Sequence, residues 1–209
     1  MEKHIYFVRH GESVENARRV FHDHTASLTE NGHAQAARAA ERVGKLGIDT
    51  VVSSTFPRAL DTAQAIATQT GLPIEQSDLF VEWMVPASFR GREYHDPELQ
   101  ETMRQVFGSS DGDYRYEDEE TFNELVARVK KAIVFLEQHS GNSLCVVTHG
   151  GFLRTFLGVM ALQETFSKEN FAAMFRRLVV NNTGITYARY DSEKNLWQLI
   201  TWNDQAHLG

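Results

Sequence analysis

Short runs of apolar residues alternate with longer segments of helical periodicity along most of this 209-residue chain. The runs at 5–8, 50–53 and 143–148 predict buried strands, because each is short and rich in β-branched or aromatic residues. At 122–136, apolar residues recur at three- and four-residue steps, which predicts an amphipathic helix. Strands that alternate with helices are joined by crossover connections, so their sheet is mostly parallel and has helices on both faces. We therefore expect an α/β fold with three layers, α/β/α, around a mostly parallel central sheet.

The remaining segments fit a single domain over residues 1–209 with one insertion. Pro57 suits the first turn of a helix and Gly71 its end, so we expect a helix between them. Clean periodicity is lost after residue 83, and we place the insertion at about 83–118. Within it we expect a helix at 97–107 and a solvated loop at 108–118. The other predicted elements are a helix at 34–46, a short strand at 79–81, a helix from 151 to about 162, and a hairpin of strands at 184–190 and 196–202.

The charge balance excludes some classes of partner. The chain carries 21 basic and 28 acidic residues, which gives a net charge of −7. A protein of net negative charge binds nucleic acid and anionic lipid poorly, so we expect neither a nucleic acid nor a membrane as partner. An anionic small molecule remains compatible with this balance, because a local cluster of arginines outweighs the global field at close range.

Cysteine content and the length of the apolar runs favour a cytoplasmic protein. Cys145 is the single cysteine, so an intrachain disulfide and a multi-cysteine metal site are excluded. The four apolar residues before Arg9 are too few for the core of a signal peptide, and no run is long enough to span a membrane. We therefore expect a cytoplasmic location.

Two similar triplets each follow a predicted strand. Arg9-His10-Gly11 follows the first strand, and Thr148-His149-Gly150 follows the strand at 143–148. Each triplet is expected only about 0.04 times by chance in a chain of this composition. Ligands of parallel sheets bind at the carboxyl ends of the strands. We therefore expect both histidines to contribute to one ligand site.

Chemically, these residues suit the transfer of a phosphoryl group. A histidine in a glycine-flanked turn can approach a ligand closely, and neutral imidazole is a competent nucleophile toward phosphorus. Arg9, Arg58 and His149 would supply donors to the three equatorial oxygens of the phosphoryl group. The helix that begins near Gly151 adds the positive end of its dipole.

Motifs in family order across positions 5–190 resemble those of the histidine phosphatase superfamily, which includes cofactor-dependent phosphoglycerate mutases and many small-molecule phosphatases. The resemblance implies a phosphoglycerate mutase-like fold, an enzyme that needs no cofactor, and a helical cap over the active site formed by the insertion. The matching pieces are RHGES at 9–13, Asn16, LTENGHAQA at 28–36, SSTFPRALDTA at 53–63, THGG at 148–151 and NNTGI at 181–185.

The same resemblance implies roles for individual residues. His10 would be phosphorylated during turnover, and no metal would be required. Glu82 occupies the position at which the family usually has its proton donor. The compact spacing of Glu followed by Gly-Trp that is common in the family is missing, so Glu75, Asp78 and Glu93 stay open as alternatives. The phosphate would be held by Arg9, Asn16, Arg58, His149 and Gly150.

The motif His22-Asp23-His24 has two interpretations. Two histidines and a carboxylate can bind zinc, which would indicate a metal-dependent hydrolase. Residues i and i+2 of an extended segment, however, point to opposite sides, and no second cluster completes a ligand set. We favour loop residues near the mouth of the pocket.

Hydrolysis is favoured over two other functions. Mutases that resemble this chain typically carry Trp-Asn after the first motif and a Gly-Trp pair beyond it, and residues 14–27 have neither. A phosphoglycerate mutase-type phosphotransferase is therefore the first alternative, and a regulator that binds a phosphate ligand without turnover is the second. We expect a small phosphorylated metabolite as substrate.

Two further points stay open at the level of the sequence. The arginines at positions 18, 19, 90 and 92 could bind a carboxylate or second phosphate of the substrate, or could be solvated at the surface. The apolar residues of the last hairpin fit either the core or a dimer surface, so the sequence does not fix the oligomeric state.

Overall fold

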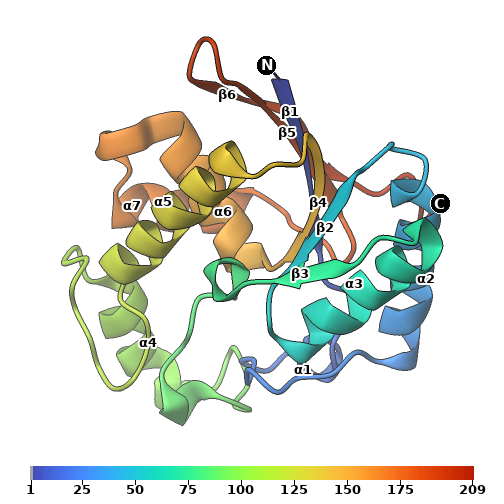
Figure 1. Ribbon diagram of the computed structural model, residues 1–209. Helices are drawn as coiled ribbons and strands as arrows, with labels where there is room; N and C mark the ends of the chain where they lie inside the picture. The colour runs from blue at the N-terminus through green and yellow to red at the C-terminus, as the bar shows by residue number, and fades with distance from the viewer. Residues whose placement is uncertain (1) are drawn as a thin grey trace.

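A six-stranded sheet forms the centre of the computed structural model, which describes residues 2–209 (Figure 1). The strand order is β3-β2-β4-β1-β5-β6. The first four strands in this order run parallel to their neighbours, whereas β5 is antiparallel to β1 and β6 to β5. The strands are β1 (Glu2–Arg9), β2 (Thr50–Ser53), β3 (Ile74–Gln76), β4 (Ser143–Thr148), β5 (Ile185–Asp191) and β6 (Leu196–Asp204). The prediction of a mostly parallel sheet is confirmed.

Helices cover both faces of this sheet, with α2 and α3 on one side and α5, α6 and α7 on the other (Figure 1). The α-helices are α1 (Val14–Arg18), α2 (Glu30–Val43), α3 (Pro57–Thr70), α4 (Gln100–Gly108), α5 (Phe122–Gln138), α6 (Gly150–Leu162) and α7 (Lys168–Arg177). Short 3₁₀ helices are η1 (Asp78–Phe80), η2 (Ala87–Phe89), η3 (Pro97–Leu99) and η4 (Gln163–Thr165). This arrangement confirms the three-layer α/β/α fold.

Successive residues of the inner strands pack into two different cores. In β1, Phe7 belongs to the core beneath α5 and α6, and Val8 belongs to the core beneath α2 and α3. Both side chains are fully buried. Burial on both faces explains why the inner strands appear in the sequence as continuous apolar runs rather than as alternating patterns.

One predicted element is wrong, and two helices were not anticipated. Residues 79–81 are not a strand: η1 lies there, Phe80 packs into the core from it, and β3 lies a few residues earlier. The hydroxyl of Ser77 accepts a hydrogen bond from Leu79 N and so caps η1. The short helices α1 and α7 both begin with a capping box, on Ser13 and Ser167.

The connection between β3 and α5, residues 77–121, is called the cap segment here. It contains the region 83–118 and lies beside the lower ends of the central strands in Figure 1, where it is drawn in green. It has a small core of its own, in which Phe89, Leu99 and Val106 pack together. Phe21 joins this core from the segment between β1 and α2, residues 10–29, which is called the first connection here. The cap segment is therefore anchored to the segment that follows β1.

Both tryptophans of the final strand, Trp197 and Trp202, pack against the core on the α6 side, whereas Leu196, Leu199 and Ile200 are exposed. In residues 2–209, no helix combines the length and apolar character needed to cross a membrane.

Candidate active site

The two histidine triplets meet at the carboxyl ends of β1 and β4. These strands are parallel neighbours, with Arg9 opposite Thr148. The backbone N–H of His10 donates to the Thr148 carbonyl at 3.0 Å, and the imidazole rings of His10 and His149 lie 5.0 Å apart. Both histidines are buried. The structure thus brings together the two motifs that the strand pattern placed at one edge.

Glycine at position 11 allows the turn that carries His10. A Cβ atom at Gly11 would lie 2.4 Å from the carbonyl oxygen of Gly32, in the first turn of α2. The Gly11 N–H donates to the Thr62 hydroxyl of α3 at 3.0 Å. The RHG turn is therefore held between α2 and α3, and the backbone contact with Gly32 leaves no room for a side chain.

Hydrogen bonds define which nitrogen of His10 is available. Its Nδ1 donates to the Gly11 carbonyl at 2.7 Å, which requires the proton on Nδ1. Its Nε2 accepts a hydrogen bond from Arg58 Nε at 3.2 Å. Burial, followed by the charge of Arg58 and the neighbouring His149, lowers the pKa of His10 well below its usual value. His10 is therefore a neutral imidazole with a lone pair on Nε2.

Two arginines flank this imidazole. Arg58, in the first turn of α3, is almost fully buried, and its Nη1 donates to the Asp23 carbonyl at 3.1 Å. Burial lowers the pKa of Arg58 to about 10 and the negative charge of Glu82 opposes that effect, so the guanidinium stays protonated at neutral pH. Arg9 donates through Nη1 to the Val180 carbonyl at 2.5 Å.

Two buried nitrogen atoms beside His10 have no hydrogen-bond partner among residues 2–209. They are Nε of Arg9 and Nδ1 of His149, whose other nitrogen lies 2.8 Å from the Ser54 hydroxyl. Buried polar groups in proteins are nearly always paired, so two unpaired nitrogens side by side are compatible with a polar ligand between them. Guanidinium N–H groups require an acceptor, and an anion bound between Arg9, His10 and His149 would supply one.

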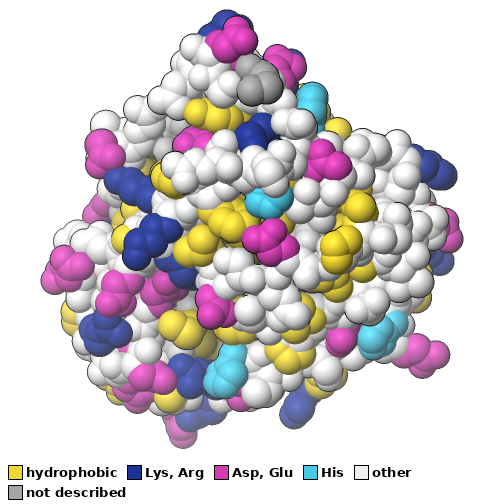
Figure 2. All heavy atoms as spheres, in the orientation of Figure 1, with side chains coloured by type: hydrophobic (Ala, Val, Ile, Leu, Met, Phe, Trp, Pro, Cys, Tyr) yellow, Lys and Arg dark blue, Asp and Glu magenta, His cyan; other side chains and the backbone are white. Residues whose placement is uncertain are grey.

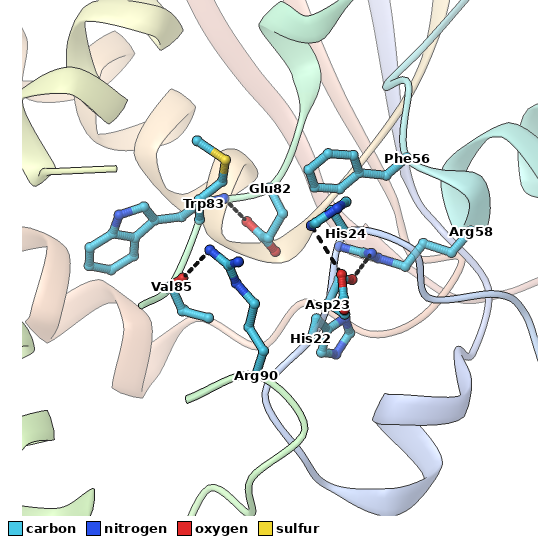
Figure 3. Close-up of a pocket in the computed structure, with 10 residues that line it drawn as sticks. His22, Asp23, His24, Phe56, Arg58, Glu82, Trp83, Val85 and Arg90 are labelled. Carbon is cyan, nitrogen blue, oxygen red and sulfur yellow. Dashed lines mark hydrogen bonds and ion pairs between the residues drawn. The ribbon is translucent and has the colours of Figure 1, made fainter. Parts of the chain in front are cut away.

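Glu82 approaches this site from the cap segment. Its two carboxylate oxygens accept hydrogen bonds from the first turn of α6, from Gly151 N and Phe152 N, both at 3.1 Å. Trp83 N donates to the same carboxylate at 2.9 Å. A Cβ at Gly151 would lie 2.5 Å from Glu82 Oε1, which explains why THGG needs its second glycine. Figure 3 shows Glu82 opposite Arg58 across the cavity.

The three other carboxylates considered from the sequence lie elsewhere. Glu75 pairs with His139 at 3.0 Å, Asp78 accepts a hydrogen bond from Thr55, and Glu93 is exposed. Glu82 is the one of these four carboxylates that lines the cavity.

The mouth of the cavity is formed by both the first connection and the cap segment (Figure 3). His22 Nε2 lies 2.9 Å from Asn16 Nδ2, whereas His24 pairs with Asp23 at 3.0 Å, so the two histidines of this motif have separate partners. Residues 2–209 contain no group of three or more His, Cys, Asp or Glu side chains arranged to hold a metal ion. The lining residues are His22, Asp23, His24, Phe56, Arg58, Glu82, Trp83, Met84, Val85 and Arg90.

Asn16 and Gly150 lie at the border of the site. The Asn16 Oδ1 accepts from Ser13 N at 3.2 Å and from Asn182 Nδ2 at 3.1 Å, and its amide nitrogen faces His22. The oxygen and the nitrogen of the Asn16 amide therefore both have partners within the protein, and Asn16 stabilises this loop. A Cβ at Gly150 would lie 3.9 Å from Arg9 Nε, which places this glycine beside the unpaired nitrogen.

Sequence reasoning missed two contributors to the site: Asn182 donates to the His10 carbonyl at 3.0 Å, and Ser54 contacts His149. His22, expected near the mouth of the pocket, lies edge-on to His10 with 6.0 Å between the ring centroids. Asn182 and Ser54 lie inside the NNTGI and SSTFPRALDTA motifs, which was the available signal. Burial, followed by the charges of Arg58 and Arg9, lowers the pKa of His22 to about 3.

The arrangement concentrates positive charge locally on a protein of net negative charge. Acidic and basic side chains are mixed over the face shown in Figure 2, with no large area of one sign. At the candidate site, by contrast, Arg58 contacts a neutral histidine, and the charge of Arg9 also acts on that histidine. Such a local concentration of positive charge attracts anions.

Comparison with known proteins agrees with this geometry. The profile of the histidine phosphatase superfamily (branch 1) matches residues 5–205. The chain belongs to the histidine phosphatase superfamily. The predictions of this family and of an enzyme within it are confirmed. A relative named "Probable phosphoglycerate mutase GpmB", from Citrobacter koseri, is 32% identical over 98% of this chain and 94% of its own length.

Solved structures of the superfamily share the fold. An alpha-ribazole phosphatase from Shigella flexneri has a TM-score of 0.78 and 18% identity, with 96% of each chain covered. A mycobacterial glucosyl-3-phosphoglycerate phosphatase, solved with VO₃, has a TM-score of 0.79 and 20% identity over 97% of this chain and all of its own. At such identities the likeness concerns the fold alone.

Proposed function

We propose that this protein is a phosphomonoester hydrolase that works through a phosphohistidine intermediate on a small phosphorylated metabolite and needs no metal ion. The observation that carries the proposal is the state of His10, a buried neutral imidazole with its proton fixed on Nδ1 and a lone pair on Nε2. Two guanidinium groups and the unpaired Nδ1 of His149 surround it. A nucleophile and an anion cradle at one site favour catalysis over a binding role without turnover.

In the first half-reaction, the His10 Nε2 lone pair forms a bond to phosphorus and the ester P–O bond breaks. Arg58 releases Nε2 and, with Arg9 and His149, donates to the phosphoryl oxygens, where charge develops in the transition state. Glu82, in its protonated form, gives its proton to the departing oxygen, so an alcohol leaves. The cationic side chains thus supply the charge stabilisation that a divalent ion supplies in other phosphatases.

In the second half-reaction, the Glu82 carboxylate takes a proton from water. The resulting hydroxide attacks phosphorus, the N–P bond breaks and its electron pair returns to His10 Nε2. Inorganic phosphate leaves, and both Glu82 and His10 are back in their starting states. The carboxylate is suited to this shuttle because three backbone N–H groups fix it within the cavity.

The lining of the cavity supports a substrate that has an apolar body. Phe56, Trp83 and Met84 give apolar surface to this lining, and Figure 3 shows Phe56 and Trp83 on opposite sides of Glu82. Solved members with this fold carry names that refer to alpha-ribazole and glucosyl-3-phosphoglycerate phosphatase activity, both on phosphorylated small molecules. A compact phosphorylated metabolite with an apolar organic portion fits this lining.

Of the four arginines considered from the sequence, Arg90 is the best placed for a second anionic group of the substrate. It lines the cavity, where one of its terminal nitrogens donates to the Val85 carbonyl, as Figure 3 shows, and to the Asp118 carboxylate. Arg92 pairs with Asp96 and Glu98. The other two, at positions 18 and 19, are exposed. A carboxylate or phosphate on the substrate could therefore bind at Arg90.

The alternative function is a phosphoglycerate mutase-type phosphotransferase. The observation that favours it is the name of the C. koseri relative, which matches nearly the whole chain. In that case the phosphoryl group of His10 would pass to a second hydroxyl of the substrate rather than to water.

The experiment measures phosphate release from a panel of phosphorylated metabolites with a chelator present, for wild type and His10→Ala. We expect metal-independent release that is lost in the variant by a factor of about 10⁴ or more. Acid-quenched protein should carry an acid-labile phosphoryl group only when His10 is present. Release from His10→Ala close to that of wild type would refute the mechanism. Interconversion of monophosphoglycerates with a bisphosphorylated primer, without phosphate release, would establish the mutase instead.

A further inference from the structure

Glu82 lies in a stretch of chain that has no regular secondary structure. Residues 81–86 follow η1 and precede η2, and they form no ladder with a strand. Backbone hydrogen bonds of a sheet therefore do not fix Glu82, in contrast to His10 at the end of β1. Other contacts have to hold its main chain in place.

Arg128, in the middle of α5, supplies those contacts. Its Nη1 donates to the carbonyls of Leu79 at 3.1 Å and Val81 at 2.8 Å. Its Nη2 donates to the carbonyl of Glu82 itself at 3.4 Å. One guanidinium thus binds three carbonyl groups of the segment 79–82, whose last residue is Glu82.

Glu120 completes a clamp around Glu82. It accepts a bidentate pair of hydrogen bonds from Arg128, at 2.7 and 2.6 Å, and such paired bonds fix the relative orientation of the two groups. Its backbone also binds the residues after Glu82: Trp83 Nε1 donates to the Glu120 carbonyl at 2.6 Å, and Glu120 N donates to the Met84 carbonyl at 3.1 Å. The clamp therefore holds the chain on both sides of Glu82.

This ion pair is shielded from water. The side chains of Arg128 and Glu120 are 15% and 8% exposed. Water cannot readily replace either partner, and removal of one leaves a buried charge without its counterpart. A lysine keeps the charge but lacks the planar fork that serves several acceptors at once. Arg128 does not line the cavity, and its hydrogen bonds reach the site through the backbone of Glu82.

We propose that Arg128, held by Glu120, is a positioning residue that fixes Glu82 for proton transfer. The inference rests on the proposed function. The carboxylate of Glu82 binds the first turn of α6, and its main chain binds α5, two helices that pack against each other in one core. The proton donor is thus fixed relative to α6, whose first turn directly follows His149.

The test compares two substrates that differ in their need for a proton. Phenyl phosphate has a poor leaving group, and 2,4-dinitrophenyl phosphate has one that departs without protonation. For Arg128→Met we expect kcat/KM to fall about 30-fold with phenyl phosphate and less than about threefold with the dinitrophenyl ester. Arg128→Lys should fall between wild type and Arg128→Met, because it restores the charge but not the fork.

Two controls separate positioning from a loss of stability. Val129→Ala removes a fully buried side chain from the adjacent position of the same helix. It should lower the melting temperature and leave the ratio of the two kcat/KM values unchanged. In the double variant Glu82→Gln/Arg128→Met, the ratio should equal that of Glu82→Gln alone, because the group to be positioned is gone.

Equal losses on both esters in Arg128→Met, or an additive double variant, would overturn the positioning role. If Glu82→Gln itself lost activity equally on both esters, Glu82 would not be the acid, and the proposed mechanism would fail together with this inference. A selective loss in Glu82→Gln without one in Arg128→Met would overturn the inference alone. If Arg128→Met does not fold, Arg128→Lys and Glu120→Gln decide the question by the same ratio.

Discussion

The two sides of the candidate site are held in place by different means. On the sheet side, which comprises Arg9, His10, Arg58 and His149, three of the four residues lie at strand ends and the fourth in the first turn of α3. On the cap side, Glu82, Trp83 and Arg90 lie outside helices and strands and depend on side-chain contacts. Backbone geometry therefore positions the residues of the sheet side, whereas contacts with residues distant in the sequence position those of the cap side. Substitutions on the two sides should impair different steps.

After His10→Ala, the largest effect is expected for Arg58→Ala on the sheet side. Loss of its donors to the phosphoryl oxygens should lower kcat/KM by about 10³, because one preorganised donor at a transition-state charge contributes about that factor. The loss should be the same for phenyl phosphate and 2,4-dinitrophenyl phosphate, since both share the phosphoryl group. Arg38→Ala, an exposed arginine of α2, is the matched control. A loss confined to one ester would contradict the assignment of Arg58 to the phosphate.

Glu82→Gln should show the opposite behaviour on the cap side. We expect kcat/KM with phenyl phosphate to fall about 100-fold, the size of a general-acid contribution, with a far smaller loss for the dinitrophenyl ester. Steady-state kinetics on both esters measure the difference. Glu93→Gln removes an exposed carboxylate of the same segment and should leave both values unchanged. If the two variants behaved alike, the acid would have to be sought elsewhere.

The pH dependence of stability tests the state of the histidines around the site. His10 and His149 are buried and His22 is half-buried, and burial lowers the pKa of all three, that of His22 to about 3. Below pH 6.5 the unfolded chain binds protons that the folded chain excludes, so stability is present above that pH and falls as the pH drops. Each such histidine contributes a slope of about 1.4 kcal/mol per pH unit.

His22→Gln, which can still accept from Asn16, should therefore reduce the slope of the unfolding free energy by about 1.4 kcal/mol per unit between pH 6 and 4. Urea unfolding at several pH values measures this slope. The exposed His33 of α2 offers a control in His33→Gln, for which no such reduction is expected. An unchanged slope in His22→Gln would mean that His22 is protonated in the folded protein.

The smallest effect is expected for Arg90→Met. Loss of one partly exposed ion pair with the substrate should raise KM for a phosphate ester that also carries a carboxylate, such as 3-phosphoglycerate, by about threefold. KM for phenyl phosphate should stay the same. Arg92→Met, whose side chain pairs with Asp96 and Glu98 instead, should change neither value. A rise for both substrates in Arg90→Met would indicate a distorted cap rather than a lost contact.

The difference between the two sides also explains what could be predicted from the sequence. Strand runs and the triplets behind them locate His10 and His149, because position along a parallel strand determines position in space. The strand expected at 79–81 was wrong, because Phe80 reaches the core from a 3₁₀ turn and apolar runs alone do not distinguish the two.

The cap side was harder to predict for a physical reason. Arg128 is 46 residues away from Glu82 in the sequence. It lies on a helix whose polar positions are typical of a solvated face, and only the packing of α5 against α6 and η1 brings it to the segment 79–82. The residues that fix Glu82 therefore carry no local signal, whereas those that fix His10 lie in motifs identified from the sequence.

The three N–H groups that fix the Glu82 carboxylate also constrain the order of events. In the proposed mechanism, one immobile carboxylate serves the departing alcohol and the incoming water, so both have to occupy the same place in turn. The alcohol must vacate that place before hydrolysis begins, and while it remains it competes with water for the phosphoryl group. On this scaffold the choice between a hydrolase and a transferase thus becomes a matter of residence time, decided by how quickly the first product leaves the cavity.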